Sequence, residues 1–92
     1  MHFFIYCVDK PDHVHVRNET RQAHLDYLGG FKEQFVALGP TMTDDGETPT
    51  GSVLIMEFED RAAAEAFVAD EPYNKAGLFE SVTIKRFRKP GG

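Results

Sequence analysis

One face of a predicted helix in this 92-residue chain carries residue types that can perform acid–base chemistry. Steps of three and four back from Leu38 meet Phe35, Phe31, Leu28, His24, Arg21 and Arg17. Residues at this spacing share one face of a helix, so this face changes from apolar to basic along its length. Histidine gains and loses protons near neutrality, because its ordinary pKa is about 6.5. We therefore expect the basic half of the face to line a pocket.

A histidine that acts as a general base needs an acidic neighbour, which fixes its tautomer and stabilises its charged form. The sequence offers Asp70, Glu71 and Asp9 as candidate partners of His24 and leaves the choice among them open. The structural alternative is also open. In that case His24 is a boundary residue with satisfied polar atoms, and the two arginines extend over the rim of the core.

The elements that position these residues follow from hydrophobic periodicity. Residues 2–8 and 52–59 are apolar on both alternating faces, which predicts central strands covered on both sides. A helix is predicted from about 15 to 37. Gly29 and Gly30 interrupt it, but the apolar spacing continues in register through Leu38, so we predict one helix with a bend.

The rest of the chain predicts two further strands and a second helix. Residues 38–51 give a short strand followed by a polar turn rich in Gly and Pro. A helix over 60–70 has Asp60 as its N-cap, with Ala63, Phe67 and Asp70 on one stripe, and Pro72 closes it near Asp70. The EPYNKAG segment is predicted as a loop, and residues 78–87 as a strand with one apolar face.

The resulting order β-α-β-β-α-β predicts an α+β, ferredoxin-like fold, with a four-stranded antiparallel sheet and two helices on one face. We expect one domain over residues 1–92, with 88–92 as a frayed tail. Two helices cover only one face of such a sheet, yet both central strands are apolar on both faces. A second copy packed face to face about a twofold axis is the simplest cover, so we expect a homodimer.

Composition excludes several classes of function. The net charge is −5, and no aromatic RNA-binding strand motif is present, so we expect no binding to nucleic acid or to anionic lipid. No run approaches the roughly 18 to 20 apolar residues of a membrane span, and no basic segment leads into an apolar signal core. We therefore expect a cytoplasmic protein.

Metal and cofactor chemistry are not expected. His13 and His15, with Asp9 and Asp12, offer ligand atoms on a surface loop, but a second spaced ligand pair is lacking. The single cysteine, Cys7, lies in an apolar run, which is typical of a buried small hydrophobe rather than a nucleophile. No Gly-rich phosphate-binding loop is present.

The predicted topology brings the candidate residues together. A right-handed crossover places the end of the first strand and the start of the first helix at one edge of the sheet, where the second helix also ends. Asp9, Arg17, Arg21 and residues 70–73 should be neighbours there, with His24 one or two turns deeper. A helix N-terminus and two arginines make this a pocket for an anionic, phenolic or enolate oxygen.

Five motifs follow one another along the chain: FFIYCVDKPD, R-x-x-x-R-x-x-H-L-x-x-L from Arg17, LGP at 38–40, TGSVLIMEFE and DEPYNKAGLFESVTIKRFRK. In their order and spacing, the chain resembles the YciI-like family over nearly its whole length. The resemblance implies a ferredoxin-like fold dimerised as in the dimeric α+β barrel superfamily. It also implies an active site centred on a histidine and an aspartate.

Carried over by position, the family histidine falls on His24. The acid of the family's Asp-Pro-Tyr motif falls on Glu71, because this chain reads Asp70-Glu71-Pro72-Tyr73. Three outcomes are open: Glu71 reaches further by one methylene, Asp70 takes over, or the pair is not intact.

The best-defined chemistry that the resemblance implies is dehydrochlorination of a chlorinated hydroxyhydroquinone to a hydroxyquinone, without a cofactor. In this reading His24 moves a proton and the acid orients it. Arg17 or Arg21 with Tyr73 holds ring oxygens, and Asp9 completes the binding set. The leading hypothesis is a lyase or isomerase of aromatic catabolism, and the alternative is a non-catalytic dimeric protein that binds a small ligand or assists another enzyme.

Overall fold

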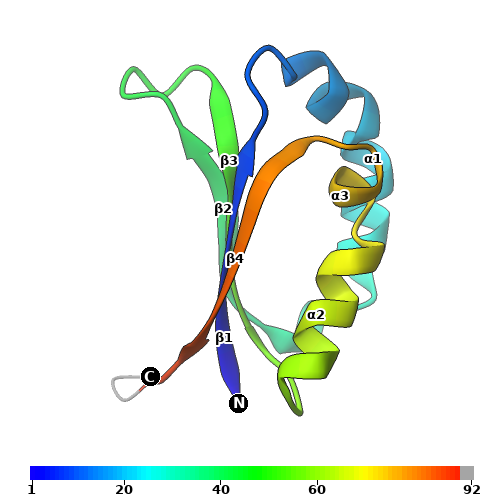
Figure 1. Cartoon of the computed structure of the whole chain (residues 1–92), viewed down its shortest axis with the longest axis vertical. Coiled ribbons are helices and arrows are strands. Elements are labelled where there is room, and N and C mark those ends of the chain that lie inside the picture. The colour runs from blue at the N-terminus through cyan, green and yellow to red at the C-terminus, as the bar shows by residue number, and fades with distance from the viewer. Residues whose placement is uncertain (90–92) are drawn as a thin grey trace.

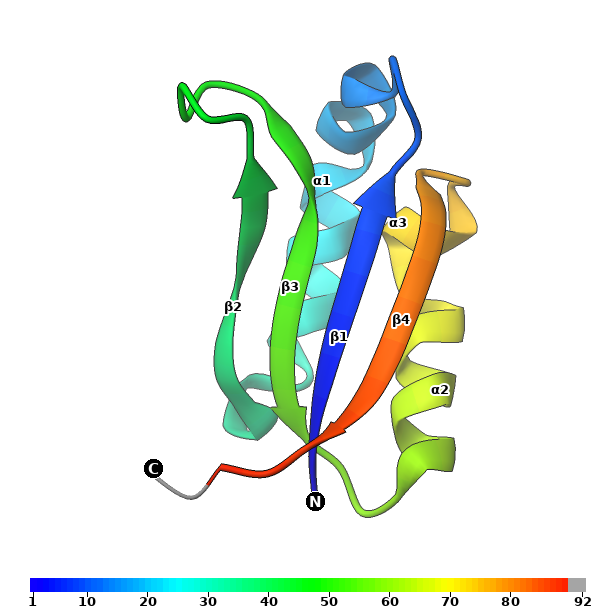
Figure 2. The same cartoon turned by 60° about the vertical axis from the view of Figure 1, so that its left-hand side comes forward.

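The structure is a computed structural model, and it describes residues 1–89. Its elements are β1 (His2–Asp9), α1 (Val14–Gly29), a 3₁₀ turn (Lys32–Gln34), β2 (Phe35–Met42), β3 (Pro49–Glu57), α2 (Arg61–Asp70), α3 (Pro72–Lys75) and β4 (Phe79–Phe87). The strands form one antiparallel sheet in the order β2-β3-β1-β4. All helices lie on one face of this sheet (Figures 1 and 2). The predicted α+β, ferredoxin-like fold is therefore confirmed.

The first helix is shorter than predicted. It ends at Gly29, and after the 3₁₀ turn the chain enters β2 at Phe35. Adjacent glycines disfavour helix by about 1 kcal/mol each, whereas Phe35–Met42 can pair with β3 along its length. Strand pairing therefore overrides the helical spacing, and Phe35 and Leu38 belong to β2 instead of the helix face.

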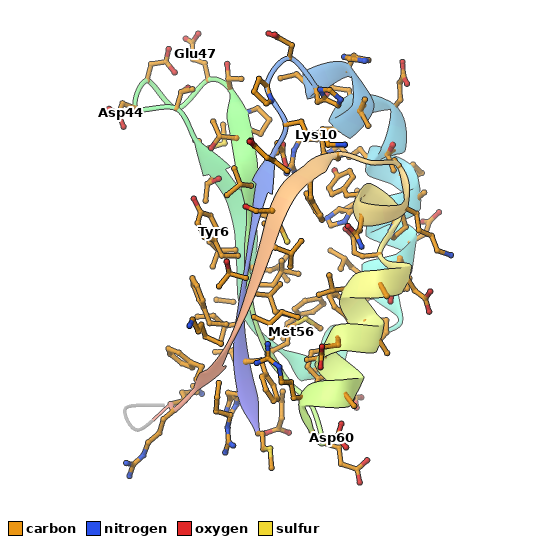
Figure 3. The ribbon with its side chains drawn as sticks, in the orientation of Figure 1. Tyr6, Lys10, Asp44, Glu47, Met56 and Asp60 are labelled. Atoms are coloured by element: carbon orange, nitrogen blue, oxygen red, sulfur yellow. The ribbon has the colours of Figure 1, made fainter. Side chains whose placement is uncertain are left out.

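The core lies between the sheet and the helices. β1 contributes Phe3, Ile5 and Cys7, β3 contributes Leu54 and Met56, and the helices contribute Leu28, Ala64, Phe67 and Val68. Figure 3 shows Met56 in this layer. Burial, together with the charges of Glu71 and Asp9, raises the pKa of the Cys7 thiol to about 12. The thiol stays protonated at neutral pH, which disfavours a nucleophilic role.

The second helix begins as predicted. The Asp60 carboxylate accepts a hydrogen bond from the Ala63 backbone N–H at 2.8 Å, which is the geometry of an N-cap. Its buried residues are Ala64, Phe67 and Val68, with Ala63 packed against them. Of the predicted stripe, Ala63 and Phe67 therefore face the core, whereas Asp70 is exposed. Within residues 1–89, no helix combines the length and apolar character needed to cross a membrane.

On the other face of the sheet the two central strands are apolar and uncovered, whereas β4 presents Ser81, Thr83 and Lys85 there. Strand alternation directs Phe4, Tyr6 and Val8 of β1, with Val53 and Ile55 of β3, away from the buried residues between them. Tyr6 is 38% exposed and projects from this side (Figure 3). No other element of the described chain lies against this face (Figure 1). The predicted frayed tail extends into residues 90–92, which lie outside the described residues.

Candidate active site

A pocket of about 290 Å³ opens between α1 and the β2–β3 side of the sheet. Its walls are formed by Arg17, Arg21, His24, Leu25, Leu38, Gly39, Pro40, Ser52, Leu54 and Tyr73. The polar residues of the α1 face therefore line a cavity, as the sequence predicted. An apolar cavity of about 150 Å³ already holds benzene, so this pocket has room for one substituted ring.

His24 is paired with Glu71. The distance from His24 Nδ1 to Glu71 Oε1 is 2.6 Å, and the two side chains are 13% and 6% exposed. An ionised carboxylate only accepts hydrogen bonds, so the contact places a proton on Nδ1 and leaves Nε2 of a neutral ring able to accept one. This arrangement fits a general base whose tautomer is fixed by its neighbour.

The local chain path explains why Glu71 reaches the histidine. Pro72 disfavours a helical conformation in the residue before it, and Glu71 is extended, with φ −65° and ψ 129°. The extended residue leaves α2 and carries its carboxylate toward α1. Of the three outcomes that the sequence left open, the structure shows an intact pair that uses the longer side chain.

Asp70 does not contact His24. It is the last residue of α2, and its side chain is 69% exposed, 3.9 Å from Lys75 Nζ. Successive helix residues point about 100° apart, so the residue before Glu71 faces solvent instead of the pocket. The structure therefore contradicts the assignment of Asp70 as an alternative partner of His24.

Asp9 and Arg17 form a buried ion pair in the pocket wall. Arg17 Nε and Nη2 donate to the two carboxylate oxygens of Asp9 at 2.8 and 3.0 Å, and both side chains are 8% exposed. Although burial alone would lower it, the bonded Asp9 carboxylate keeps the pKa of the Arg17 guanidinium above its usual value. Asp9 is therefore bound to Arg17, and the structure contradicts its assignment as a partner of His24.

Tyr73 connects the two pairs. Its ring is stacked on His24, with ring centroids 4.0 Å apart and planes at 16°, and the Arg17 guanidinium lies 4.7 Å from its centroid. Burial raises the pKa of the Tyr73 phenol, although the nearby Arg17 charge opposes this. The phenol is thus protonated at neutral pH and can donate a hydrogen bond. Tyr73 belongs to α3, a short helix where the sequence predicted a loop.

Arg21 is the exposed cation of the pocket. It lines the cavity, yet within residues 1–89 no carboxylate lies within 4.0 Å of its guanidinium. Because Asp9 neutralises Arg17, Arg21 supplies the uncompensated positive charge that an anionic ligand would meet.

Sequence reasoning missed the residues contributed by β2 and β3. Leu38 was assigned to the apolar stripe that continues the α1 face, and Gly39 and Pro40 were predicted in a short strand with no role in the pocket. Ser52 had a usable signal, because it shares the inward alternation of Leu54 and Met56 and is therefore a polar residue facing inward on a central strand.

The described chain holds no preassembled cluster of metal ligands. Within residues 1–89, no group of three or more His, Cys, Asp or Glu side chains is placed to hold a metal ion. His13 and His15 have ring centroids 5.8 Å apart, and His13 Nδ1 lies 2.7 Å from the Pro11 carbonyl oxygen.

The YCII-related domain family matches residues 1–88 of the chain. This protein belongs to that family. Protein YciI of Escherichia coli O6:H1 is 36% identical to this YCII-related domain over 96 residues, which cover 97% of this chain and 98% of the relative. An uncharacterized protein of Haemophilus influenzae is 32% identical with the same coverage. The predicted YciI-like family is therefore confirmed.

A solved structure resembles this YCII-related domain over most of both chains. It is 5-chloro-2-hydroxyhydroquinone dehydrochlorinase, TftG, from Burkholderia phenoliruptrix AC1100, in complex with 2,5-dihydroxybenzoquinone. The identity is 38%, the TM-score is 0.90, and 96% of this chain and 94% of that chain are covered. An antibiotic biosynthesis monooxygenase from Bacteriodes thetaiotaomicron has a TM-score of 0.59 at 10% identity, a likeness of fold alone.

Proposed function

We propose that this protein is a cofactor-free lyase that removes HCl from a chlorinated hydroxyhydroquinone to give a hydroxyquinone in aromatic catabolism. The observation that carries the proposal is the 2.6 Å contact between His24 and Glu71 beside a pocket of about 290 Å³. The 38% identity to TftG supports the choice of substrate class.

The proposed reaction needs only proton transfers. Protonation of the carbon that carries chlorine converts the adjacent hydroxyl into a ketone as its proton leaves. Removal of the proton from the other hydroxyl of the 1,4 pair then expels chloride and restores conjugation. The ring loses one proton and one chloride overall, so the step requires no external oxidant. A single neutral imidazole can carry out these transfers: Nε2 takes the proton of the adjacent hydroxyl and delivers it to the carbon, then takes the proton of the other hydroxyl and releases it to solvent.

Each pocket residue has a distinct role in this proposal. His24 moves the protons through Nε2, and Glu71 fixes the ring through Nδ1. The Tyr73 phenol and Arg21 bind ring oxygens. Arg17 was predicted as a possible substrate ligand. Because its guanidinium is bonded to Asp9, we assign it a positioning role instead, in which it supports the Tyr73 ring in the pocket wall.

Turnover of chlorinated substrate tests the proposal. The purified protein should release chloride from 5-chloro-2-hydroxyhydroquinone under anaerobic conditions, with the quinone appearing at the same rate in its absorbance band. A panel of chlorinated and plain hydroxyhydroquinones gives the control. Binding of these compounds without chloride release would overturn the lyase and favour the non-catalytic, ligand-binding alternative.

Arg21→Gln should weaken the binding of anionic ring ligands. The side chain is exposed and partly screened, so we expect about a three- to tenfold higher Kd for 2,5-dihydroxybenzoquinone, which is ionised at neutral pH. Affinity for the wild type should fall with added salt more steeply than for the variant. Calorimetric titration at two salt concentrations measures both. Arg86→Gln, the same charge change at an exposed β4 position away from the pocket, should bind like the wild type, and an equal loss in both variants would contradict a local role.

We also propose that the bare sheet face is the interface of a homodimer. Phe4, Val53 and Ile55 surround the exposed Tyr6 there, and a second copy would cover all of them. Light scattering should give about twice the chain mass of 10.4 kDa. Tyr6→Lys should shift the protein to monomer, whereas Val14→Lys, at an equally exposed apolar residue on α1, should not. A monomeric wild type at micromolar concentration would overturn this interface.

A further inference from the structure

We propose that Ser52 is a further substrate-binding residue, whose hydroxyl donates a hydrogen bond to a ring oxygen of the ligand. The inference rests on the proposed function, because it concerns the same pocket and the same class of oxygenated ring. It adds a contact from the sheet to those that α1 and α3 supply, and it would make recognition depend on one particular ring oxygen.

Ser52 lies at the floor of the pocket on a central strand. It is 6% exposed and lines the same cavity as His24 and Tyr73. In the sheet it is opposite Cys7 of β1 and Pro40 of β2. The hydroxyl is thus held on a strand that is paired on both sides, which suits a group that must select one orientation of a ring.

The hydrogen bonding of Ser52 leaves its own proton available. Arg17 Nη2 donates to Ser52 Oγ at 3.0 Å. A guanidinium has no acceptor, so Oγ must be the acceptor in this contact, and the hydroxyl proton takes no part in it. Within residues 1–89, this is the one hydrogen bond that the Ser52 side chain makes. Buried polar groups are normally hydrogen-bonded, so an acceptor atom of a ligand in the cavity would satisfy this unused proton.

The neighbouring charge makes this hydroxyl a stronger donor. Asp9 holds the guanidinium of Arg17 through two hydrogen bonds, and Arg17 in turn polarises Ser52 Oγ. A hydroxyl that accepts from a cation donates more strongly, because hydrogen bonds in a chain reinforce one another. The preferred acceptor is an oxygen that carries negative charge, such as a phenolate or the oxygen of an ionised hydroxyquinone.

The experiment measures binding, so that it does not depend on turnover. 2,5-Dihydroxybenzoquinone is ionised at neutral pH and so carries the preferred acceptor oxygen, whereas hydroquinone and phenol are neutral, and each is titrated calorimetrically under anaerobic conditions into wild type and Ser52→Ala. We expect the variant to bind the ligand that carries the recognised oxygen about tenfold more weakly, the value of one lost hydrogen bond. Its affinity for the ligand that lacks this oxygen should equal that of the wild type.

Two further variants keep the result unambiguous. Ser52→Cys retains the side-chain size but has only a weak donor, so it should behave like Ser52→Ala and replaces it if the alanine variant unfolds. Ser81→Ala removes an exposed serine on β4 and should bind like the wild type. Equal affinity of the wild type and both Ser52 variants for all three ligands would overturn the role of Ser52 alone. Failure of the wild type to bind any of them would overturn this role together with the proposed function.

Discussion

Replacing His24 by alanine should lower kcat for dehydrochlorination by about 10²- to 10⁴-fold, the range that a positioned acid–base group contributes. Imidazole is a side-chain group that can serve as both acid and base, and the contact of His24 with Glu71 fixes the nitrogen that faces away from the acid. Anaerobic chloride release measures the loss.

Matched variants separate this role from a structural one. His15→Ala removes an exposed histidine of the same helix and should leave kcat unchanged. Glu71→Gln keeps the shape but removes the charge, and it should lower kcat by between about 10²- and 10⁴-fold. Asp70→Asn, one residue earlier, should have no effect, because Asp70 faces solvent. Wild-type turnover in His24→Ala would remove the main support for the enzyme.

Arg17→Met should lower the free energy of unfolding by about 3 to 5 kcal/mol, because it leaves the Asp9 carboxylate buried without its cation. The pair is 8% exposed on both sides, and Arg17 also bonds Ser52 and lies over the Tyr73 ring. Urea denaturation measures the effect as a lower midpoint at an unchanged slope.

Another arginine in the chain provides the control. Arg61 and Glu65 form an exposed pair at 3.7 Å, with side chains 54% and 59% exposed, so Arg61→Met should cost less than about 0.5 kcal/mol. Combining Arg17→Met with Asp9→Asn should be less destabilising than the sum of the two single changes, since the stranded charge is removed. If Arg17→Met lowers the free energy of unfolding no more than Arg61→Met does, the Asp9–Arg17 ion pair is not buried as described.

The departure of this chain from the Asp-Pro-Tyr motif keeps the proposed chemistry intact. Glu71 is 4% exposed, and its oxygen still lies 2.6 Å from the histidine nitrogen. The extra methylene of Glu71, compared with the aspartate of the motif, is therefore accommodated without loss of its contact with His24. The variant Glu71→Asp restores the side chain of the family motif and so tests whether the longer acid is needed to contact His24. Its kcat is measured by anaerobic chloride release, together with that of His24→Ala.

The sequence by itself determined the order of the elements and the polar half of the α1 face. Alternation in residues 2–8 and 52–59 identified the central strands, and Asp60 identified the start of α2. Spacing of three and four placed Arg17, Arg21 and His24 on one face. These features depend on neighbours within a few residues, so local geometry is enough to predict them.

Only the tertiary structure decided which groups meet. Pairing with β3 placed Phe35 in a strand instead of the predicted helix, and it placed Leu38 in the pocket wall. The extended backbone at Glu71 lets this residue, and not Asp70, contact His24. The hydrogen bonds of Arg17 to Asp9 and Ser52 hold Arg17 in the pocket wall. Each of these contacts joins side chains from different elements. Their direction depends on how those elements pack, which local propensity and spacing do not specify.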